Sequence, residues 1–249
     1  MRLFLTSSPC WDDVPEGVEL PCILNEENQF VDKLRESWTP GAQCLIISAD
    51  PENYEMNDEM LETFWAAFSY HGMPFEDMAV CDERNESDIE ELIEESDMII
   101  LGGGHVPTQN AFFERIHLRE ILQEYPGVVM GISAGTMNCA ETVYAQPELE
   151  GESLDPDYQR FIQGLGLVDL MILPHYQMVK DNVLDGQRLY EDITYSDSMG
   201  REFYVLVDGS YILVQDGKAE LYGEGYLIRD GEIEKICSLG ESICITTGE

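Results

Sequence analysis

An apolar run that ends in a glycine–serine–glycine pattern constrains this chain more than any other feature. Residues 127–135 have the sequence GVVMGISAG, and the last five match the G-x-S-x-G pattern of a sharp turn between a strand and a helix. The glycines flanking Ser133 permit the tight backbone, so the hydroxyl is exposed at the strand end. The N–H groups that open the following helix face the same place, where a negatively charged oxygen would be stabilised. The pattern predicts a nucleophilic Ser133; the alternative is a serine that caps the helix.

A second glycine-rich turn precedes this one in the sequence. Gly102, Gly103 and Gly104 follow the apolar run at residues 99–101. In a parallel sheet both turns would lie at the carboxyl edge, where α/β proteins bind their ligands. This placement favours the interpretation of Ser133 as part of a catalytic site.

Strand-like and helix-like segments alternate up to about residue 200. Further apolar runs occupy residues 3–7, 44–49, 75–81 and 167–173, and apolar side chains recur at helical spacing within residues 25–38, 57–70 and 108–124. A continuous apolar run such as CLIISA is typical of a strand that is buried on both faces. The alternation predicts an α/β fold with a doubly wound, mostly parallel sheet and helices on both faces.

The pattern changes at Phe203, where short β-type runs begin. Asp-Gly pairs, which are typical of hairpin turns, separate these runs at positions 208–209, 216–217 and 230–231. We therefore expect residues from about 200 to 249 to form an antiparallel extension of the main sheet, within a single domain that spans residues 1–249. Residues 147–164 are polar and irregular, which predicts a loop over the site, and residues 185–195 are expected to be helical.

Composition excludes several classes of function. Fifty acidic and thirteen basic side chains give a net charge of −37, which would repel nucleic-acid backbones and anionic membranes. No apolar run approaches the roughly 20 residues of a membrane span, and the first residues, MRLFLTSSP, are interpreted as a strand rather than a signal peptide. Seven scattered cysteines without a C-x-x-C pair favour a reduced, cytoplasmic protein. The acidic residues at 82–97 are interpreted as a solvated helix face rather than a metal site.

A nucleophilic serine needs a base within hydrogen-bonding distance. The four histidines are His71, His105, His117 and His175. The first is interpreted as a helix C-cap beside a glycine, and the third as a solvated mid-helix residue. His175 follows the apolar run 167–173 at the same predicted sheet edge as Ser133, so we expect it to be the base. His105 directly follows the triple glycine and is the alternative.

The base in turn needs an orienting acid. Asp208 ends the run 203–207, the next predicted strand after His175. The order Ser133, His175, Asp208 would place all three after strands of the sheet, and we prefer it to Asp169, although Asp208 also fits an ordinary Asp-Gly turn. Further alternatives for the acid are Glu202, Glu220 and Glu224.

The order and spacing of these motifs resemble the dipeptidase E and cyanophycinase family of serine peptidases over roughly residues 99–209. Their fold is that of class I glutamine amidotransferases, with serine in place of the cysteine nucleophile. The resemblance implies a role for each matching residue: Ser133 as nucleophile, Pro174-His175 as the base, Val207-Asp208-Gly209 as the acidic turn, and Gly103 or Gly104 with Ala134 as the oxyanion hole. It implies a small peptide as substrate and no metal or organic cofactor. We expect a monomer or a homodimer.

Two positions depart from this family. His105 stands where the family often has Asn, and residues 184–188, LDGQR, stand where dipeptidase E has a Thr-Arg-Glu-x-Arg segment whose arginine holds the substrate's aspartate. Asp185 takes the place of that arginine. We therefore expect His105, Asp185 and Arg188 to contact the substrate, with Asp185 disfavouring peptides that begin with Asp. A preference for acidic substrates would be restored if Arg188, on the same predicted helix, or Lys180 pointed its side chain into the site.

The sequence thus predicts a serine peptidase that acts on small peptides. Two other functions use the same residues: a non-catalytic amidotransferase-like binding module, and an esterase or acyltransferase with the same triad. A binding module would have no need of a complete triad. Substrate profiling would distinguish a peptidase from an esterase or acyltransferase.

Overall fold

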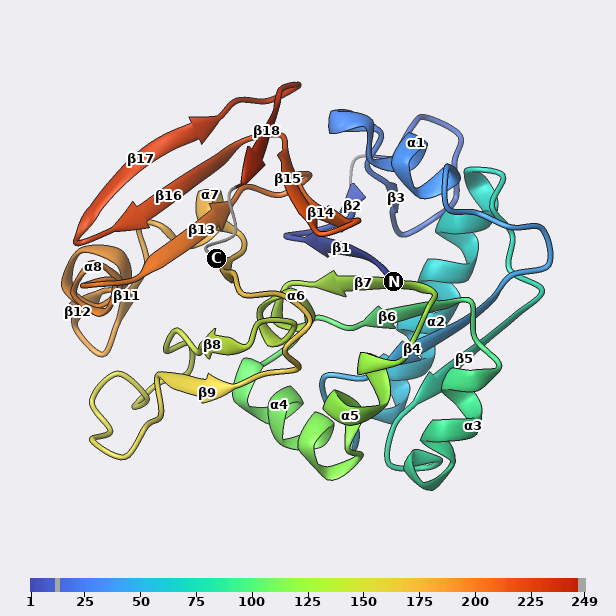
Figure 1. The fold of residues 1–249 in the computed structure, drawn as a ribbon, viewed down its shortest axis with the longest axis horizontal. Helices are drawn as coiled ribbons and strands as arrows, with labels where there is room; N and C mark the ends of the chain where they lie inside the picture. Colours follow the sequence, from blue (N-terminus) through green and yellow to red (C-terminus); the bar gives the residue numbers. More distant parts are fainter. Residues whose placement is uncertain (12–13, 246–249) are drawn as a thin grey trace.

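A large sheet with a smaller sheet beside it forms the framework of the computed structural model, which describes residues 1–11 and 14–245 (Figure 1). The large sheet has the strand order β18-β15-β14-β1-β7-β6-β4-β5. Its strands, in that order, are Ser242–Ile245, Lys218–Tyr222, Tyr211–Gln215, Arg2–Thr6, Val128–Ile132, Met98–Leu101, Gln43–Ile47 and Asp77–Cys81.

Five neighbouring strands of this sheet are parallel. Strand β1 pairs in parallel with β7, β7 with β6, β6 with β4, and β4 with β5. Strands β14, β15 and β18 then continue the sheet in antiparallel fashion on the other side of β1. The predicted α/β class, with a mostly parallel sheet and an antiparallel C-terminal extension, is confirmed.

Helices cover both faces of the sheet, because successive side chains of each buried strand point in opposite directions. Leu3 and Leu5 of β1 belong to the core under α3, α4 and α5, whereas Phe4 packs in the core under α1 and α2. The helices and helical turns are α1 (Phe30–Arg35), α2 (Tyr54–Tyr70), α3 (Ile89–Glu94), α4 (Val106–Arg115), α5 (Leu118–Gln123), α6 (Ala134–Asn138), α7 (Tyr176–Val179), α8 (Tyr195–Asp197), η1 (Glu27–Gln29), η2 (Glu86–Asp88) and η3 (Leu189–Thr194).

The second sheet has the order β10-β13-β16-β17, and its strands are Met171–Leu173, Glu202–Leu206, Gly225–Arg229 and Glu232–Cys237. The C-terminal extension is therefore shared between two sheets, contrary to the expectation that it continues only the main one. Asp216-Gly217 and Asp230-Gly231 are hairpin turns, as predicted, with positive φ at all four residues. Asp208-Gly209 is not a hairpin turn, because it joins β13 of the second sheet to β14 of the first.

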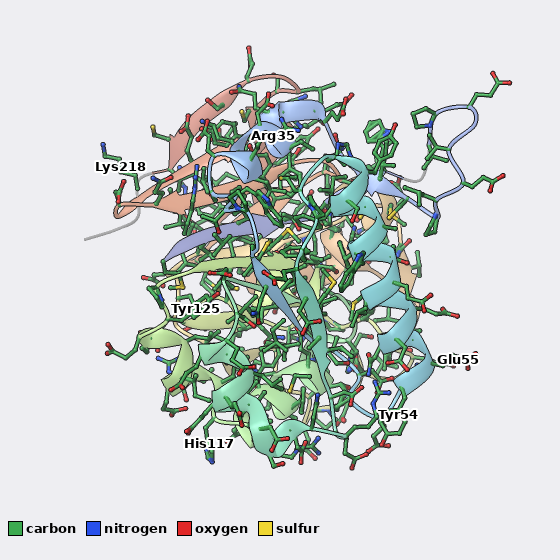
Figure 2. The ribbon with its side chains drawn as sticks, turned by 90° about the vertical axis from the view of Figure 1, so that its right-hand side faces the viewer. Arg35, Tyr54, Glu55, His117, Tyr125 and Lys218 are labelled. Carbon is green, nitrogen blue, oxygen red and sulfur yellow. The ribbon has the colours of Figure 1, made fainter. Side chains whose placement is uncertain are left out.

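Three short hairpins complete the strands. They are β2–β3 (Cys10–Trp11 with Ile23–Leu24), β8–β9 (Thr142–Tyr144 with Phe161–Gln163) and β11–β12 (Val183–Leu184 with Gln187–Arg188). The last one corrects the start of the helix predicted over residues 185–195, because Asp185 and Gly186 adopt φ values of 52° and 82° and form its turn. The helical residues begin at Leu189, with η3. The helix predicted over residues 108–124 is divided at His117, which lies exposed at the outer surface between α4 and α5 (Figure 2).

No helix within residues 1–11 and 14–245 is long and apolar enough to cross a membrane. Nor do three or more His, Cys, Asp or Glu side chains within these residues gather into a group that could hold a metal ion.

Candidate active site

The turn at Ser133 has the geometry that its glycines predict. Strand β7 ends at Ile132, α6 begins at Ala134, and Ser133 between them has φ 50° and ψ −113°. A Cβ on Gly131 would lie 2.7 Å from Thr136 Cα, and one on Gly135 would lie 2.2 Å from the Leu101 carbonyl oxygen. Neither position can hold a side chain without moving backbone. Positive φ at a residue other than glycine costs about 1–3 kcal/mol, and such strain is concentrated at functional sites.

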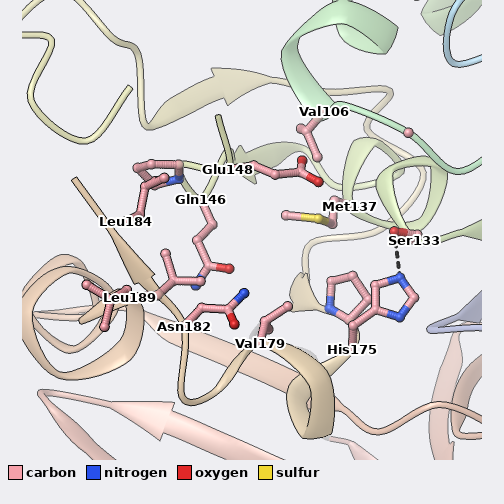
Figure 3. A pocket seen from close by; sticks show the side chains of 14 residues that line it. Val106, Ser133, Met137, Gln146, Glu148, His175, Val179, Asn182, Leu184 and Leu189 are labelled. Atoms are coloured by element: carbon pink, nitrogen blue, oxygen red, sulfur yellow. Dashed lines mark hydrogen bonds between the residues drawn. The ribbon is translucent and has the colours of Figure 1, made fainter. Parts of the chain in front are cut away.

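Ser133 begins a chain of hydrogen bonds that runs through His175 to Asp208. The Ser133 Oγ lies 2.9 Å from His175 Nε2 (Figure 3). On the other side of the ring, His175 Nδ1 lies 2.7 Å from Asp208 Oδ1. An ionised carboxylate only accepts hydrogen bonds, so Nδ1 carries the proton and Nε2 is free to accept from the hydroxyl. This is the arrangement in which a histidine acts as general base toward a serine.

The second sheet positions the histidine and the aspartate. Strands β10 and β13 are parallel neighbours, so His175 after one and Asp208 after the other lie at the same edge. His175 adopts the left-handed conformation, with φ 59°, directly after Pro174. The nucleophile thus comes from the first sheet and its two partners from the second, which corrects the picture of three turns in one continuous sheet.

Ser7, at the end of β1, ties the two sheets together. Its hydroxyl donates to Asp208 Oδ1 at 2.6 Å and accepts from the His175 backbone N–H at 2.8 Å. Gln177 Nε2 donates to the other carboxylate oxygen, Oδ2, at 2.5 Å. Burial acts to raise the pKa of Asp208, but the hydrogen bonds from His175, Ser7 and Gln177 outweigh it and leave the pKa below its ordinary value. Asp208 is therefore charged at neutral pH.

The glycine turn after β6 lies against the serine. A Cβ on Gly103 would be 3.4 Å from Ser133 Cβ, and one on Gly104 would be 2.6 Å from Ala49 Cβ. The Gln109 side chain holds this turn by donating to the Gly102 carbonyl oxygen at 2.7 Å. The N–H groups of Gly103 and Gly104 have no acceptor among the described residues. Together with the N–H of Ala134 at the start of α6, they remain the predicted oxyanion hole.

A cavity of about 340 Å³ opens beside Ser133. Its lining combines the two catalytic candidates with apolar and amide side chains, several of which are drawn in Figure 3. The lining residues are Gly104, Val106, Ser133, Met137, Gln146, Pro147, Glu148, Pro174, His175, Val179, Asn182, Val183, Leu184 and Leu189.

Comparison with known proteins identifies the family. The model of Peptidase family S51 matches residues 47–222, which include Ser133, His175 and Asp208. The chain belongs to Peptidase family S51. No curated protein sequence matches it. Its fold is similar to the 1.5 Å crystal structure of a candidate peptidase E protein from Listeria monocytogenes EGD-e, with a TM-score of 0.57 and 16% identity over 95% of this chain and 98% of that one. The recognised resemblance to the dipeptidase E family is thereby confirmed.

The other residues predicted for this S51 site lie around the cavity rather than in its lining. Both ring nitrogens of His105 are occupied, Nδ1 by Thr108 Oγ1 and Nε2 by Glu152 Oε1, each at 2.8 Å. His105 is therefore not placed to serve as the base. Asp185 accepts from the backbone N–H groups of Gly151 and Ser153 and from the Ser153 hydroxyl.

Arg188 is likewise directed elsewhere, because it forms an ion pair with Asp192 at 2.6 Å. Among the alternative acids, Asp169 is exposed, and Glu202 and Glu224 pair with Arg229 and Lys235. Glu220 bonds to Tyr222 and Ser242 instead.

Sequence reasoning missed Ser7, Gln177, Glu148 and Glu152. Ser7 could have been predicted from the sequence. It directly follows a strand that pairs in parallel with the strand before Ser133, so the two serines lie at the same edge of the sheet. Gln177 lies two residues after His175 and shares its turn. No sequence pattern distinguishes Glu148 and Glu152, because they are two of fifty acidic residues and lie in an irregular loop.

Proposed function

We propose that this S51 family member is a serine peptidase that hydrolyses small peptides through Ser133, His175 and Asp208. The observation that carries the proposal is the hydrogen-bonded chain from the strained serine to a charged carboxylate. A serine held in this conformation, with an imidazole nitrogen 2.9 Å away, is arranged to lose its proton as it attacks.

Each group has a defined task in the reaction. The Ser133 oxygen attacks the peptide carbonyl carbon while His175 Nε2 takes the hydroxyl proton. The negative charge that develops on the carbonyl oxygen is held by the N–H groups of Ala134 and of Gly103 or Gly104, and one such donor contributes about 3 kcal/mol. The C–N bond then breaks as His175 gives its proton to the leaving amine. Water, activated by the same imidazole, hydrolyses the acyl-serine ester and restores the hydroxyl.

The cavity favours short substrates. Its volume of about 340 Å³ lies at the lower end of the roughly 300–1,000 Å³ of small-molecule sites. Two sides of it are formed by loop residues such as Gln146 and Pro147 and by the hairpin residues Val183 and Leu184. These walls leave room for a dipeptide or a similarly small acyl compound.

The second candidate is an esterase or acyltransferase, because acyl transfer from an ester would use the same groups. A library of dipeptides, N-acetylated dipeptides and p-nitrophenyl esters, assayed with the wild type and with Ser133→Ala, separates the two. The peptidase proposal expects turnover of one or more dipeptides that is lost in Ser133→Ala. Turnover of esters alone would favour the second candidate, and dipeptide hydrolysis that survives Ser133→Ala would exclude the serine mechanism.

A further inference from the structure

The cavity beside Ser133 contains a carboxylate without a counter-ion. Its polar side chains, besides Ser133 and His175, are Gln146, Glu148 and Asn182, and its lining residues include no Lys or Arg. Glu148 is therefore the group that sets the charge of this wall.

The Glu148 side chain extends from the loop into the cavity on the side of Met137 (Figure 3). Within residues 1–11 and 14–245, no hydrogen bond or ion pair is made to its carboxylate. Desolvation by the cavity wall raises the pKa of Glu148 above its ordinary value. Glu148 and His175 line the same cavity, so a ligand that reaches Ser133 lies beside this carboxylate.

The backbone of Glu148 is held without use of its own side chain. Glu152 Oε2 accepts from the N–H groups of Glu148 and Leu149, at 2.8 and 2.9 Å, while its Oε1 lies 2.8 Å from His105 Nε2. Asp185 holds the next turn of the loop through Gly151 and Ser153. The Glu148 carboxylate is thus presented in a defined place while remaining free to bind, which lowers the entropy cost of binding.

We propose that Glu148 binds a cationic group of the substrate, either its α-ammonium or the side chain of a Lys or Arg residue, and so determines specificity at this site. The inference rests on the proposed peptidase function. Glu148 is an exposed residue whose carboxylate lines the cavity without a partner among the described residues, so a ligand cation bound there would be its first counter-ion, and the net charge of −37 attracts cations over a longer range. A substrate aspartate in the same place would be repelled. The selectivity first expected of Asp185 is thereby assigned to Glu148, because the carboxylate of Asp185 is occupied by the loop.

The test measures binding in the absence of turnover, by calorimetry on Ser133→Ala and on the double variant Ser133→Ala/Glu148→Gln. Three peptides separate the possible cations: Ala-Leu carries only an α-ammonium, N-acetyl-Lys-Leu only a cationic side chain, and N-acetyl-Ala-Leu neither. We expect Glu148→Gln to weaken binding of a cationic peptide roughly tenfold, the effect of losing one charged hydrogen bond, and to leave N-acetyl-Ala-Leu unchanged. Glu150→Gln is the matched control, because it removes the same charge from the same loop at a position that is also exposed but does not line the cavity.

Each outcome has a defined meaning. If Glu148→Gln weakens the binding of Ala-Leu alone, Glu148 binds the α-ammonium of the substrate. If it weakens the binding of N-acetyl-Lys-Leu alone, Glu148 binds the cationic side chain. The proposal is overturned if Glu148→Gln changes all three affinities equally, changes none, or if no cationic peptide binds more tightly than N-acetyl-Ala-Leu. Because these measurements need no hydrolysis, a failure of the peptidase function would appear separately, as a wild type that binds peptides without cleaving them.

Discussion

The two walls of the cavity are held in different ways. The catalytic wall consists of three turns at the ends of buried strands, joined by short hydrogen bonds among Ser7, Ser133, His175 and Asp208. The loop wall, formed by residues 146–153, contains no strand residue and is held by the carboxylates of Glu152 and Asp185.

We expect this difference to separate chemistry from recognition. In the proposed mechanism a group on the catalytic wall acts on the reacting atoms, so its loss should lower kcat. A group on the loop wall would act on the position of a binding surface, so its loss should raise KM and leave the chemical step nearly intact. Substitutions on the two walls test whether the division holds, and the expected effects of four of them range from about 10⁶-fold to about tenfold or less.

The largest effect is expected from His175→Ala. Triad members act as a unit, so kcat/KM for the best dipeptide should fall roughly 10⁶-fold, as in a well-evolved serine peptidase. His105→Ala is the matched control, because that histidine contacts the loop wall, and it should cost no more than about tenfold. A larger loss in His105→Ala than in His175→Ala would reverse the assignment of the base.

Asp208→Asn should lower kcat roughly 10⁴-fold, because the imidazole loses its orienting charge and its preferred tautomer. Since Asn has nearly the same shape as Asp and is equally tolerated in turns, far-ultraviolet circular dichroism should be unchanged. A fully active Asp208→Asn would mean that another acid orients His175.

Asp208 should also contribute to stability in a pH-dependent way. Its pKa is lower in the folded protein than in the unfolded chain, so its stabilisation is complete above the ordinary Asp value of about 4 and is lost as the pH falls below it. The free energy of unfolding of the wild type should therefore fall more steeply below about pH 4 than that of Asp208→Asn, measured by urea unfolding.

Ser7→Ala should have an intermediate effect. The hydroxyl makes two hydrogen bonds, of about 0.5–1.5 kcal/mol each, which position Asp208 and the backbone of His175. We expect kcat to fall roughly tenfold with little change in KM. Ser8→Ala is the control, because its hydroxyl donates to the Cys10 carbonyl oxygen and not to the triad. A change in KM alone would show that Ser7 belongs with the binding residues instead.

The smallest effect is expected from Glu152→Gln, on the loop wall. Loss of the charge weakens its bonds to His105 and to the backbone of Glu148, so KM should rise roughly threefold to tenfold while kcat stays within about twofold. The measurement is the steady-state kcat and KM of Glu152→Gln, with Glu150→Gln as the control. A fall in kcat as large as that of Ser7→Ala would remove the distinction between the two walls.

The sequence predicted the catalytic wall better than the loop wall. The turns of the catalytic wall depend mainly on residues next to them in the sequence, whereas other contacts join residues far apart in the chain. The turn at Ser133 is specified by its own glycines, and His175 by the strand that precedes it. The contact of Ser7 with Asp208 joins residues that are far apart in the chain, and it exists because β1 lies between β7 and β14. No local pattern contains that information.

The errors have the same origin. Asp185-Gly186 carries the same hairpin signal as Asp216-Gly217, but the sequence predicted a helix over residues 185–195, and the resemblance to dipeptidase E gave Asp185 a place in the specificity site. Asp208-Gly209 carries the signal too, yet the strands on either side of it pair in different sheets. Which acid approaches His175 or His105 among fifty candidates is decided by tertiary packing.

The most direct test of the central claim is to identify the residue that reacts with a fluorophosphonate. The wild type should form one covalent adduct, located by tandem mass spectrometry in the peptide that contains Ser133, and both Ser133→Ala and His175→Ala should lose it. An adduct on another residue, or labelling of Ser133 that persists undiminished in His175→Ala, would contradict an activated serine at this site.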